Sequence, residues 1–172
     1  IYRHKIVAIT PPEACVDIVM TDNCAAIMQL PIDLADSARA VAMLISGDFN
    51  PCGRLASTVY TNTDREYIKY KTHRERDGIK TASFIGYRYY DTAGDRKEFP
   101  FGHGLGYTKF EYADLKLTEN SASFTVKNLG NRAGNEIVQV YIGKNDPGVI
   151  RAKRELCAFA KVHLGPKEKK EV

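Results

Sequence analysis

The feature that most constrains this chain is a glycine-rich stretch at residues 99–108, which reads Phe-Pro-Phe-Gly-His-Gly-Leu-Gly-Tyr-Thr. Three glycines within five residues indicate a backbone that takes positive φ values or passes close to another surface, and the two phenylalanines would anchor it. We therefore expect a packed loop that forms a hinge between two half-domains. A phosphate-cradling loop is disfavoured, because strand-like residues 107–112 follow it in place of a helix.

The composition excludes several classes of protein. With 44% hydrophobic and 27% charged residues among 172, the chain has the composition of a globular protein. No apolar run approaches the roughly 20 residues of a membrane-spanning helix, so no membrane partner is expected. The net charge of +4 is spread among acidic residues, which argues against a nucleic-acid partner. Because the first residue is Ile1 and no signal-peptide pattern follows, we expect the chain to be cut from a longer protein.

Cysteine and histidine positions predict neither a metal site nor a cofactor. Neither set shows the spacing of metal ligands. We expect free thiols that act as small buried hydrophobes in a reducing compartment, and hence a cytoplasmic protein, although one disulfide remains open. The cysteines are Cys15, Cys24, Cys52 and Cys157, and the histidines are His4, His73, His103 and His163.

Residues 1–60 read as part of an α/β structure. Residues 5–9 predict a buried strand, and the apolar stretches 14–20 and 25–30 predict short strands with small connections or a helix. The clearest helix spans residues 34–46, with Asp33 or Asp36 as its cap and Gly47 as its end. Its apolar face carries Ala38, Val41, Ala42 and Ile45.

The turn that follows the helix, at residues 48–55, contains polar side chains that invite two interpretations. Asp48 or Asn50 could be catalytic, but side chains of this type in a turn more often bond their own turn. We expect both to do so and to pair with Arg54. Residues 61–82 then read as a long, charged surface crossing with interleaved tyrosines.

Residues 84–91 combine aromatic and β-branched side chains and predict a strand. Its alternation places Ile85, Tyr87 and Tyr89 on one face. Tyrosine rings can stack on sugar rings, and a neighbouring basic side chain can donate hydrogen bonds to the hydroxyl groups of the sugar. Tyr87, Arg88 and Tyr90 are therefore the candidate substrate-binding residues.

Beyond the glycine-rich stretch the pattern has a period near two. Short strands separated by turn signals predict a Greek-key sandwich of the immunoglobulin or fibronectin type. Such a sandwich needs ~100 residues, so we expect closing strands to be missing and one sheet edge to be open. The predicted strands cover 110–112, 115–117, 122–127, 136–142 and 153–162.

Five motifs together resemble glycoside hydrolase family 3, the β-glucosidase and β-xylosidase family. The stretch 99–110 is similar to the family's F-P-F-G-[YH]-G-L-[SG]-Y-T-x-F. The other four are GDFNPCGRL at 47–55, GYRYYD at 86–91, VKNLGNRAGNEIVQVY at 126–141, and KREL at 153–156 followed by Phe159, Lys161 and Val162. The chain departs from the family at residues 31–38, where P-G-x-E-G-G is usual, and at Cys52 and Ala56, where the family usually has Ser or Ala and Pro.

The resemblance implies the fold class α/β plus all-β, namely the C-terminal part of an α/β sandwich followed by an incomplete fibronectin type III-like β-sandwich. The implied divisions are 1–60 for the α/β part, 61–106 for the crossing segment and hinge, and 107–172 for the fibronectin-like part. The family's nucleophilic Asp lies in a TIM-like barrel and its acid/base Glu in an earlier part of the α/β sandwich. Neither motif occurs here, so no catalytic residue is assigned, and Glu13, Asp17 and Asp22 receive no such role.

The resemblance thus implies the non-catalytic C-terminal portion of a retaining, exo-acting β-glycosidase that removes terminal β-linked sugars. A retaining glycosidase needs two carboxylates about 5 to 5.5 Å apart, which we expect elsewhere in a longer enzyme. The partners implied are its oligosaccharide or glycoside substrate, the barrel and the rest of the sandwich, while the chain alone would be inactive. Two alternatives stay open: a free-standing carbohydrate-binding or adhesion module, and a portion of a pseudoenzyme that lacks one carboxylate.

Overall fold

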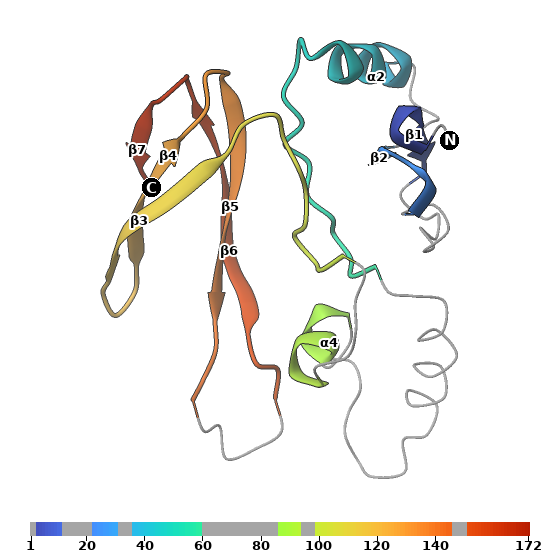
Figure 1. Cartoon of the computed structure of the whole chain (residues 1–172). Helices are drawn as coiled ribbons and strands as arrows, with labels where there is room; N and C mark the ends of the chain where they lie inside the picture. Colours follow the sequence, from blue (N-terminus) through green and yellow to red (C-terminus); the bar gives the residue numbers. More distant parts are fainter. Residues whose placement is uncertain (1–2, 12–21, 31–35, 60–85, 94–98, 146–150) are drawn as a thin grey trace, which may run out of the picture. The chain divides into compact units, whose positions relative to one another are not determined.

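A computed structural model describes residues 3–11, 22–30, 36–59, 86–93, 99–145 and 151–172 (Figure 1). The chain divides into two compact units, which are described separately. Unit 1 comprises residues 1–38, 55–103 and 142–155, and unit 2 comprises residues 39–54, 104–141 and 156–172. The predicted strand at 14–20 and the crossing at 61–82 lie outside the described residues.

Unit 1 contains a short parallel sheet. A 3-10 turn η1 (Arg3–Lys5) precedes β1 (Val7–Thr10), which pairs in parallel with β2 (Ala26–Gln29). Parallel pairing requires a crossover between the strands and is typical of α/β structure. The strands predicted at 5–9 and 25–30 are therefore confirmed, but the expectation that the first is buried is wrong, because Val7 and Ile9 are exposed and only Thr10 is buried in β1.

Helix α2 (Ser37–Ser46) confirms most of the helix predicted at 34–46; residues 34–35 are not described. It ends where expected, because Gly47 takes a φ of +82° that favours glycine. None of its residues is buried. The apolar face is thus present in the pattern but remains solvent-exposed in this chain.

Helix α4 (Tyr87–Ala93) replaces the strand predicted over 84–91, so that prediction is wrong where the structure describes the segment. Gly86, with a φ of +58°, starts the helix, and its carbonyl oxygen accepts bonds from the amides of Tyr89 and Tyr90. The aromatic side chains that suggested a strand serve tertiary contacts instead: Tyr90 is buried and the Tyr87 ring stacks on Phe101. Packing has overridden a weak local β propensity.

Unit 2 holds most of the β-sandwich. One sheet has the order β3-β4-β7, formed by β3 (Phe110–Leu117), β4 (Ala122–Asn128) and β7 (Lys169–Glu171), and the other pairs β5 (Gly134–Ile142) with β6 (Glu155–Leu164). The predicted strands are confirmed, with two differences. The runs 110–112 and 115–117 form one strand, bulged between Ala113 and Lys116 with Asp114 at a φ of 56°, and β7 was not predicted.

The core of unit 2 lies between its two sheets. Four buried side chains form it, and Phe110, Phe124 and Val172 pack against it. Alternation along β4 puts Phe124, Val126 and Asn128 on the same face, so a polar amide takes its place in the core layer. The four buried side chains are Val126, Val138, Val162 and Leu164.

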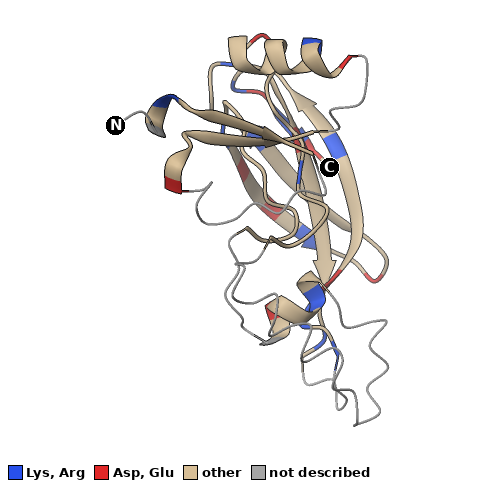
Figure 2. Cartoon of the chain, turned by 90° about the vertical axis from the view of Figure 1, so that its right-hand side faces the viewer, with Lys and Arg blue, Asp and Glu red and all other residues tan. Residues whose placement is uncertain are grey.

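Charged residues of both signs occupy the strands (Figure 2). In the β3-β4-β7 sheet of unit 2, Glu111 on β3 lies opposite Lys127 on β4, and Lys127 lies opposite Lys169 on β7. No helix among the described residues is long and apolar enough to cross a membrane.

Candidate functional site

The glycine-rich loop is held against the turn that follows α2. Asn50 Oδ1 accepts a bond of 2.6 Å from the Tyr107 amide, and Asn50 Nδ2 lies 3.5 Å from the Ala133 carbonyl oxygen. The Tyr107 hydroxyl group donates to the Leu44 carbonyl oxygen at 2.6 Å. The segments 50–54 and 104–108 thus lie side by side, as Figure 1 shows.

Two glycines allow this close approach. A Cβ added to Gly104 would collide with the Gly53 carbonyl oxygen, and one added to Gly106 would stand 2.9 Å from the Asn50 Oδ1 atom. Gly102 adds a φ of +79° in the turn before them. The expectation of a packed loop with positive φ or close approach is confirmed, with positive φ at one glycine and close approach at the other two.

A buried ion pair lies beside this loop. Arg54 Nη2 is 2.5 Å from Glu136 Oε2, and the two side chains retain only 16% and 9% of their exposure. The second carboxylate oxygen, Oε1, accepts a bond of 2.7 Å from the Tyr112 hydroxyl group. Burial, and then the hydrogen bond to Glu136, raise the pKa of Tyr112 well above its usual range.

The side-chain amide of Asn128 is hydrogen-bonded inside the core through both its oxygen and its nitrogen. Its Oδ1 accepts bonds from the Thr108 hydroxyl group at 2.5 Å and the Gly130 amide at 2.9 Å. Its Nδ2 donates to the carbonyl oxygens of Arg132, Gly165 and, at a longer 3.3 Å, Leu164. Because unpaired buried amides are costly, this side chain fixes the backbone segments 130–132 and 164–165 and the Thr108 side chain relative to one another.

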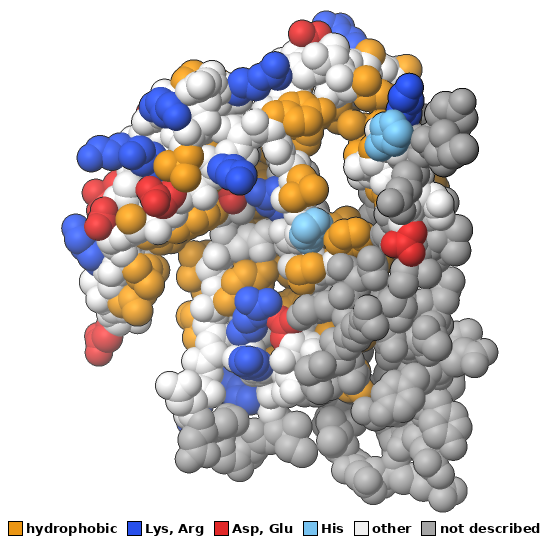
Figure 3. Space-filling model, in the orientation of Figure 1, with side chains coloured by type: hydrophobic (Ala, Val, Ile, Leu, Met, Phe, Trp, Pro, Cys, Tyr) orange, Lys and Arg blue, Asp and Glu red, His pale blue; other side chains and the backbone are white. Residues whose placement is uncertain are grey.

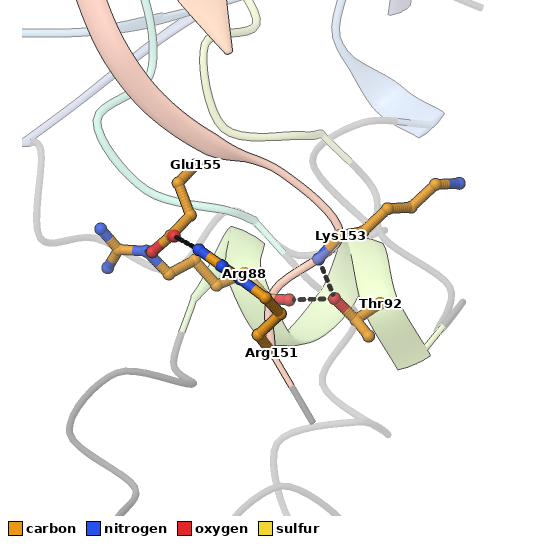
Figure 4. A network of polar contacts seen from close by, with 5 residues as sticks. All are labelled: Arg88, Thr92, Arg151, Lys153 and Glu155. Carbon is orange, nitrogen blue, oxygen red and sulfur yellow. Dashed lines mark hydrogen bonds and ion pairs between the residues drawn. The ribbon is translucent and has the colours of Figure 1, made fainter. Parts of the chain in front are cut away.

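A second polar cluster joins α4 to the start of β6 in unit 1 (Figure 4). Arg88 Nε lies 3.2 Å from Glu155, and Arg151 Nη2 lies 3.1 Å from the other oxygen of the same carboxylate. The Thr92 hydroxyl group donates to the Arg88 carbonyl oxygen and accepts from the Lys153 amide. The motifs at 86–91 and 153–156 therefore bind each other.

The three candidate substrate-binding residues all take part in packing within unit 1. Tyr87 stacks on Phe101 with ring centroids 4.5 Å apart, Arg88 pairs with Glu155, and Tyr90 is 3% exposed. They come from one helix rather than from the alternating positions of a strand. A role in sugar binding stays a prediction.

The predicted bonding of the turn at 48–55 is wrong in its partners. Asp48 accepts a bond from the Ser46 hydroxyl group, whereas Arg54 pairs with Glu136 instead of Asp48 or Asn50. Glu136 is 82 residues away from Arg54 in the sequence, a distance that local turn statistics do not cover. Glu136, Tyr112 and Asn128 were missed as functional positions, although Asn128 and Glu136 both lie in the motif at 126–141.

Titratable residues build no metal centre in the described part of the chain, where no group of three or more His, Cys, Asp or Glu is suitably arranged. Cys24, Cys52 and Cys157 are free thiols. The expectation that the cysteines are buried is wrong for Cys157, which is exposed on β6 and donates to the Val140 carbonyl oxygen, and Cys24 and Cys52 are only half-buried. Cys15, Glu13 and Asp17 lie outside the described residues, and Asp22 is exposed.

Comparison with known families identifies two regions. The sequence model of the glycosyl hydrolase family 3 C-terminal domain matches residues 4–107, and that of the fibronectin type III-like domain matches residues 136–172. The first match spans more than half of the chain and contains the segments at 47–55, 86–91 and 99–107. These regions agree with an α/β portion followed by a β-sandwich.

Individual relatives agree with the family match. The thermostable beta-glucosidase B of Acetivibrio thermocellus is 43% identical over 143 residues, which cover 77% of this chain and 19% of that protein. The structure of beta-glucosidase 3B from Thermotoga neapolitana in complex with glucose superposes with a TM-score of 0.84 at 30% identity, covering 98% of this chain and 25% of its own. The beta-glucosidase of Kluyveromyces marxianus in complex with glucose gives 0.80 at 33%, covering 97% and 21%. The chain spans about a fifth to a quarter of these relatives.

Proposed function

The chain belongs to glycosyl hydrolase family 3, and from that premise we propose that it is the non-catalytic C-terminal portion of a retaining, exo-acting β-glucosidase. The longer polypeptide, called the parent enzyme below, would remove terminal β-linked glucose from oligosaccharides or glycosides. Its barrel and the rest of its α/β sandwich would carry the two carboxylates that retention requires.

The observation that carries this proposal is the use of the motif side chains. The motif side chains bond to this chain's own backbone and side chains, as Asn50, Arg54 and Glu136 show. A catalytic acid or nucleophile needs an oxygen that can reach the substrate, whereas both oxygens of the Glu136 carboxylate are bound. The motifs therefore support a scaffold for chemistry carried out elsewhere.

Such a scaffold contributes to the reaction rate of the parent enzyme by holding its catalytic parts in place. A misplacement of about 1 Å can cost a hundredfold in rate, and supporting residues that are locked by packing and hydrogen bonds prevent it. The clasp between residues 50–54 and 104–108 is a support of this kind. Arg88, Thr92 and Glu155 do the same for α4 in unit 1 (Figure 4).

The first test is the mass of the natural polypeptide, detected by blotting with an antibody raised against residues 107–172. We expect a band several times heavier than 19.2 kDa. The immunopurified polypeptide should hydrolyse an aryl β-glucoside and cellobiose and release glucose first as the β anomer, which NMR detects. The 172-residue chain by itself should turn over neither substrate.

Other outcomes would favour other functions. A natural band at 19.2 kDa together with oligosaccharide binding by the 172-residue chain would favour a free-standing module. A heavy polypeptide without hydrolytic activity would favour a pseudoenzyme. Release of the α anomer would retain the family assignment and overturn the retaining mechanism.

We place the parent enzyme in the cytoplasm. The three described cysteines are free thiols, which suits a reducing compartment. Subcellular fractionation with the same antibody tests this location, and recovery from the medium or the cell envelope would contradict it.

A further inference from the structure

Strand β3 contains one residue more than its pairing with β4 can use. The register shifts between Ala113 and Lys116. There, Asp114 and Leu115 on β3 lie opposite a single residue of β4, Phe124. Asp114 takes a φ of 56°, in the left-handed region that Asp adopts more readily than most residues. This two-against-one arrangement is a β-bulge, which bends a strand and increases its local twist.

The apolar residues of β3 change phase at this bulge. Before it they stand at even positions, Phe110 and Tyr112, and after it they stand at odd positions, Leu115 and Leu117. Without Asp114 the strand would read Phe-Glu-Tyr-Ala-Leu-Lys-Leu, an unbroken alternation that is typical of a regular strand. Asp114 is therefore the residue that interrupts an otherwise regular strand.

The position of β3 at the edge of the β3-β4-β7 sheet gives this interruption its importance. In β4, the backbone groups of Phe124 and Asn128 bond residues 172 and 168, which flank β7. Because such bonds alternate along an antiparallel strand, the residues of β4 between them bond β3. The backbone groups of Tyr112 are then directed outward from the sheet. A regular edge of this kind is a template on which another strand can pair.

The side chains of β3 add to this hazard. Tyr112 is 48% exposed, Leu115 is 63% exposed and Leu117 is 71% exposed. Figure 3 shows hydrophobic side chains at the surface among charged ones in the region of β3. The opposite edge strand, β7, consists of charged residues only (Lys169–Glu171), which discourage the addition of a strand. The longer and more apolar β3 edge needs a different protection.

We propose that the bulge at Asp114 is a device that prevents β3 from pairing with β3 of a second copy of the chain. A strand that paired regularly with residues 110–113 would be out of step with residues 116–117, because the extra residue shifts the alternation of the backbone groups by one position. The increased twist also turns the edge away from a flat partner. This inference is independent of the proposed function, since it concerns the sheet edge of the chain itself.

The test removes Asp114 from the natural polypeptide, which restores the alternating pattern and keeps every other residue of β3. The deletion variant should form a dimer with about twice the molar mass of the natural polypeptide, as two identical edges joined across a two-fold axis require. Light scattering after gel filtration, at equal protein concentrations, measures the mass. An unchanged mass in a deletion variant that unfolds cooperatively would overturn the proposal.

Asp114→Asn separates the backbone geometry from the charge. Asn keeps the extra residue and tolerates a positive φ, so this variant should keep the mass of the natural polypeptide. If Asp114→Asn associates as strongly as the deletion variant, the charge protects the edge and the bulge does not, and the proposal is wrong.

Leu117→Pro tests the route of association. Leu117 lies opposite Ala122, an even position of β4 like Phe124, so its backbone groups also point outward. A proline there removes a donor that only an added strand would use. Added to the deletion variant, Leu117→Pro should restore the natural mass. A dimer that persists would show association through another surface and would contradict pairing at the β3 edge.

Two further variants control for misfolding. Deletion of Lys167, an exposed residue with a φ of 61° in the turn before β7, should destabilise the protein without association, and equal association would overturn the proposal. If the variant that lacks Asp114 shows no cooperative unfolding, Asp114→Val replaces it, because a β-branched side chain disfavours positive φ and favours extended backbone. Its mass should then exceed that of Asp114→Asn, and equal masses would overturn the proposal.

Discussion

Arg54 and Glu136 form a largely buried ion pair, Nη2 to Oε2 at 2.5 Å, although 82 positions separate them in the sequence. The pair joins the turn after α2 to β5, and Tyr112 on β3 completes the carboxylate's bonds. Removing one member of such a pair leaves a charge that is buried without compensation.

Glu136→Ala should lower the free energy of unfolding by about 3 to 5 kcal/mol, because the Arg54 guanidinium loses its carboxylate within the structure. The double variant Arg54→Met with Glu136→Ala should recover a large part of that loss. Urea denaturation of the four species in a double-mutant cycle measures both effects. Additive losses would show that the two residues do not depend on each other.

Tyr112→Phe should remove a pH dependence at the alkaline end. The raised pKa of Tyr112 means that folding favours the neutral phenol, so its contribution is full below the usual tyrosine pKa of about 10 and is lost as pH rises beyond it. The variant should lose ~1 kcal/mol at neutral pH through the missing hydrogen bond but decline less in alkali. Unfolding measured across this pH range tests the sign; parallel profiles for the two proteins would contradict it.

Asn128→Asp keeps the shape of the side chain but loses the Nδ2 donor that reaches three carbonyl oxygens. It also places a carboxyl group among those oxygens, so we expect a loss of at least about 2 kcal/mol. Asn131→Asp, at an exposed position three residues away, is the matched control and should change stability little. Thermal unfolding of both variants side by side gives the comparison.

Gly104→Ala should destabilise the loop by about 1 to 3 kcal/mol, because the new methyl group collides with the Gly53 carbonyl oxygen. Gly53→Ala provides the control, since nothing lies within 4 Å of its added Cβ. There the change should be neutral or slightly stabilising. Hydrogen exchange of the Tyr107 amide reports the loop directly and should accelerate in Gly104→Ala alone.

Tyr87→Ala separates packing from sugar binding. If Tyr87 serves only to stack on Phe101, the variant should lose about 2 to 4 kcal/mol of stability. In that case the parent enzyme's KM for an aryl β-glucoside should not change below the unfolding temperature. A raised KM in a variant of unchanged stability would instead support the predicted substrate contact. Arg88→Ala, which breaks a partly exposed pair, should cost less than about 1 kcal/mol.

Local patterns predicted much of the fold. The strands of unit 2 follow from alternation and turn residues, and α2 follows from apolar periodicity with Gly47 at its end. Helix α4 replaces the predicted strand because Tyr87 stacks on Phe101 and Tyr90 is buried, and such tertiary contacts lie outside a local sequence window. The short strand β7 carries charged side chains and gives no hydrophobic signal.

The contacts of the candidate site were harder to predict from the sequence than the strands and helices. Motif resemblance marked the segments that carry Asn50, Arg54 and Glu136, but not which residue bonds which. Those pairings depend on tertiary contacts across more than 80 residues. The glycines were the exception, because their spacing alone predicted that the loop passes close to another surface. In the structure, Gly104 lies against Gly53 and Gly106 lies against Asn50.

The fit of Gly104 against Arg54 and Gly53 has a further consequence for the route by which the chain folds. Unit 2 includes residues up to 54 and continues at residue 104. The two chain ends at this break lie in the segments 50–54 and 104–108, which contact each other. Bringing these ends together closes the chain between them, and the entropy cost of such a closure grows only logarithmically with the number of residues enclosed. The cost of closure therefore depends little on how many residues lie between positions 54 and 104, whereas the close fit of Gly104 against Gly53 and Arg54 decides whether the two ends stay together.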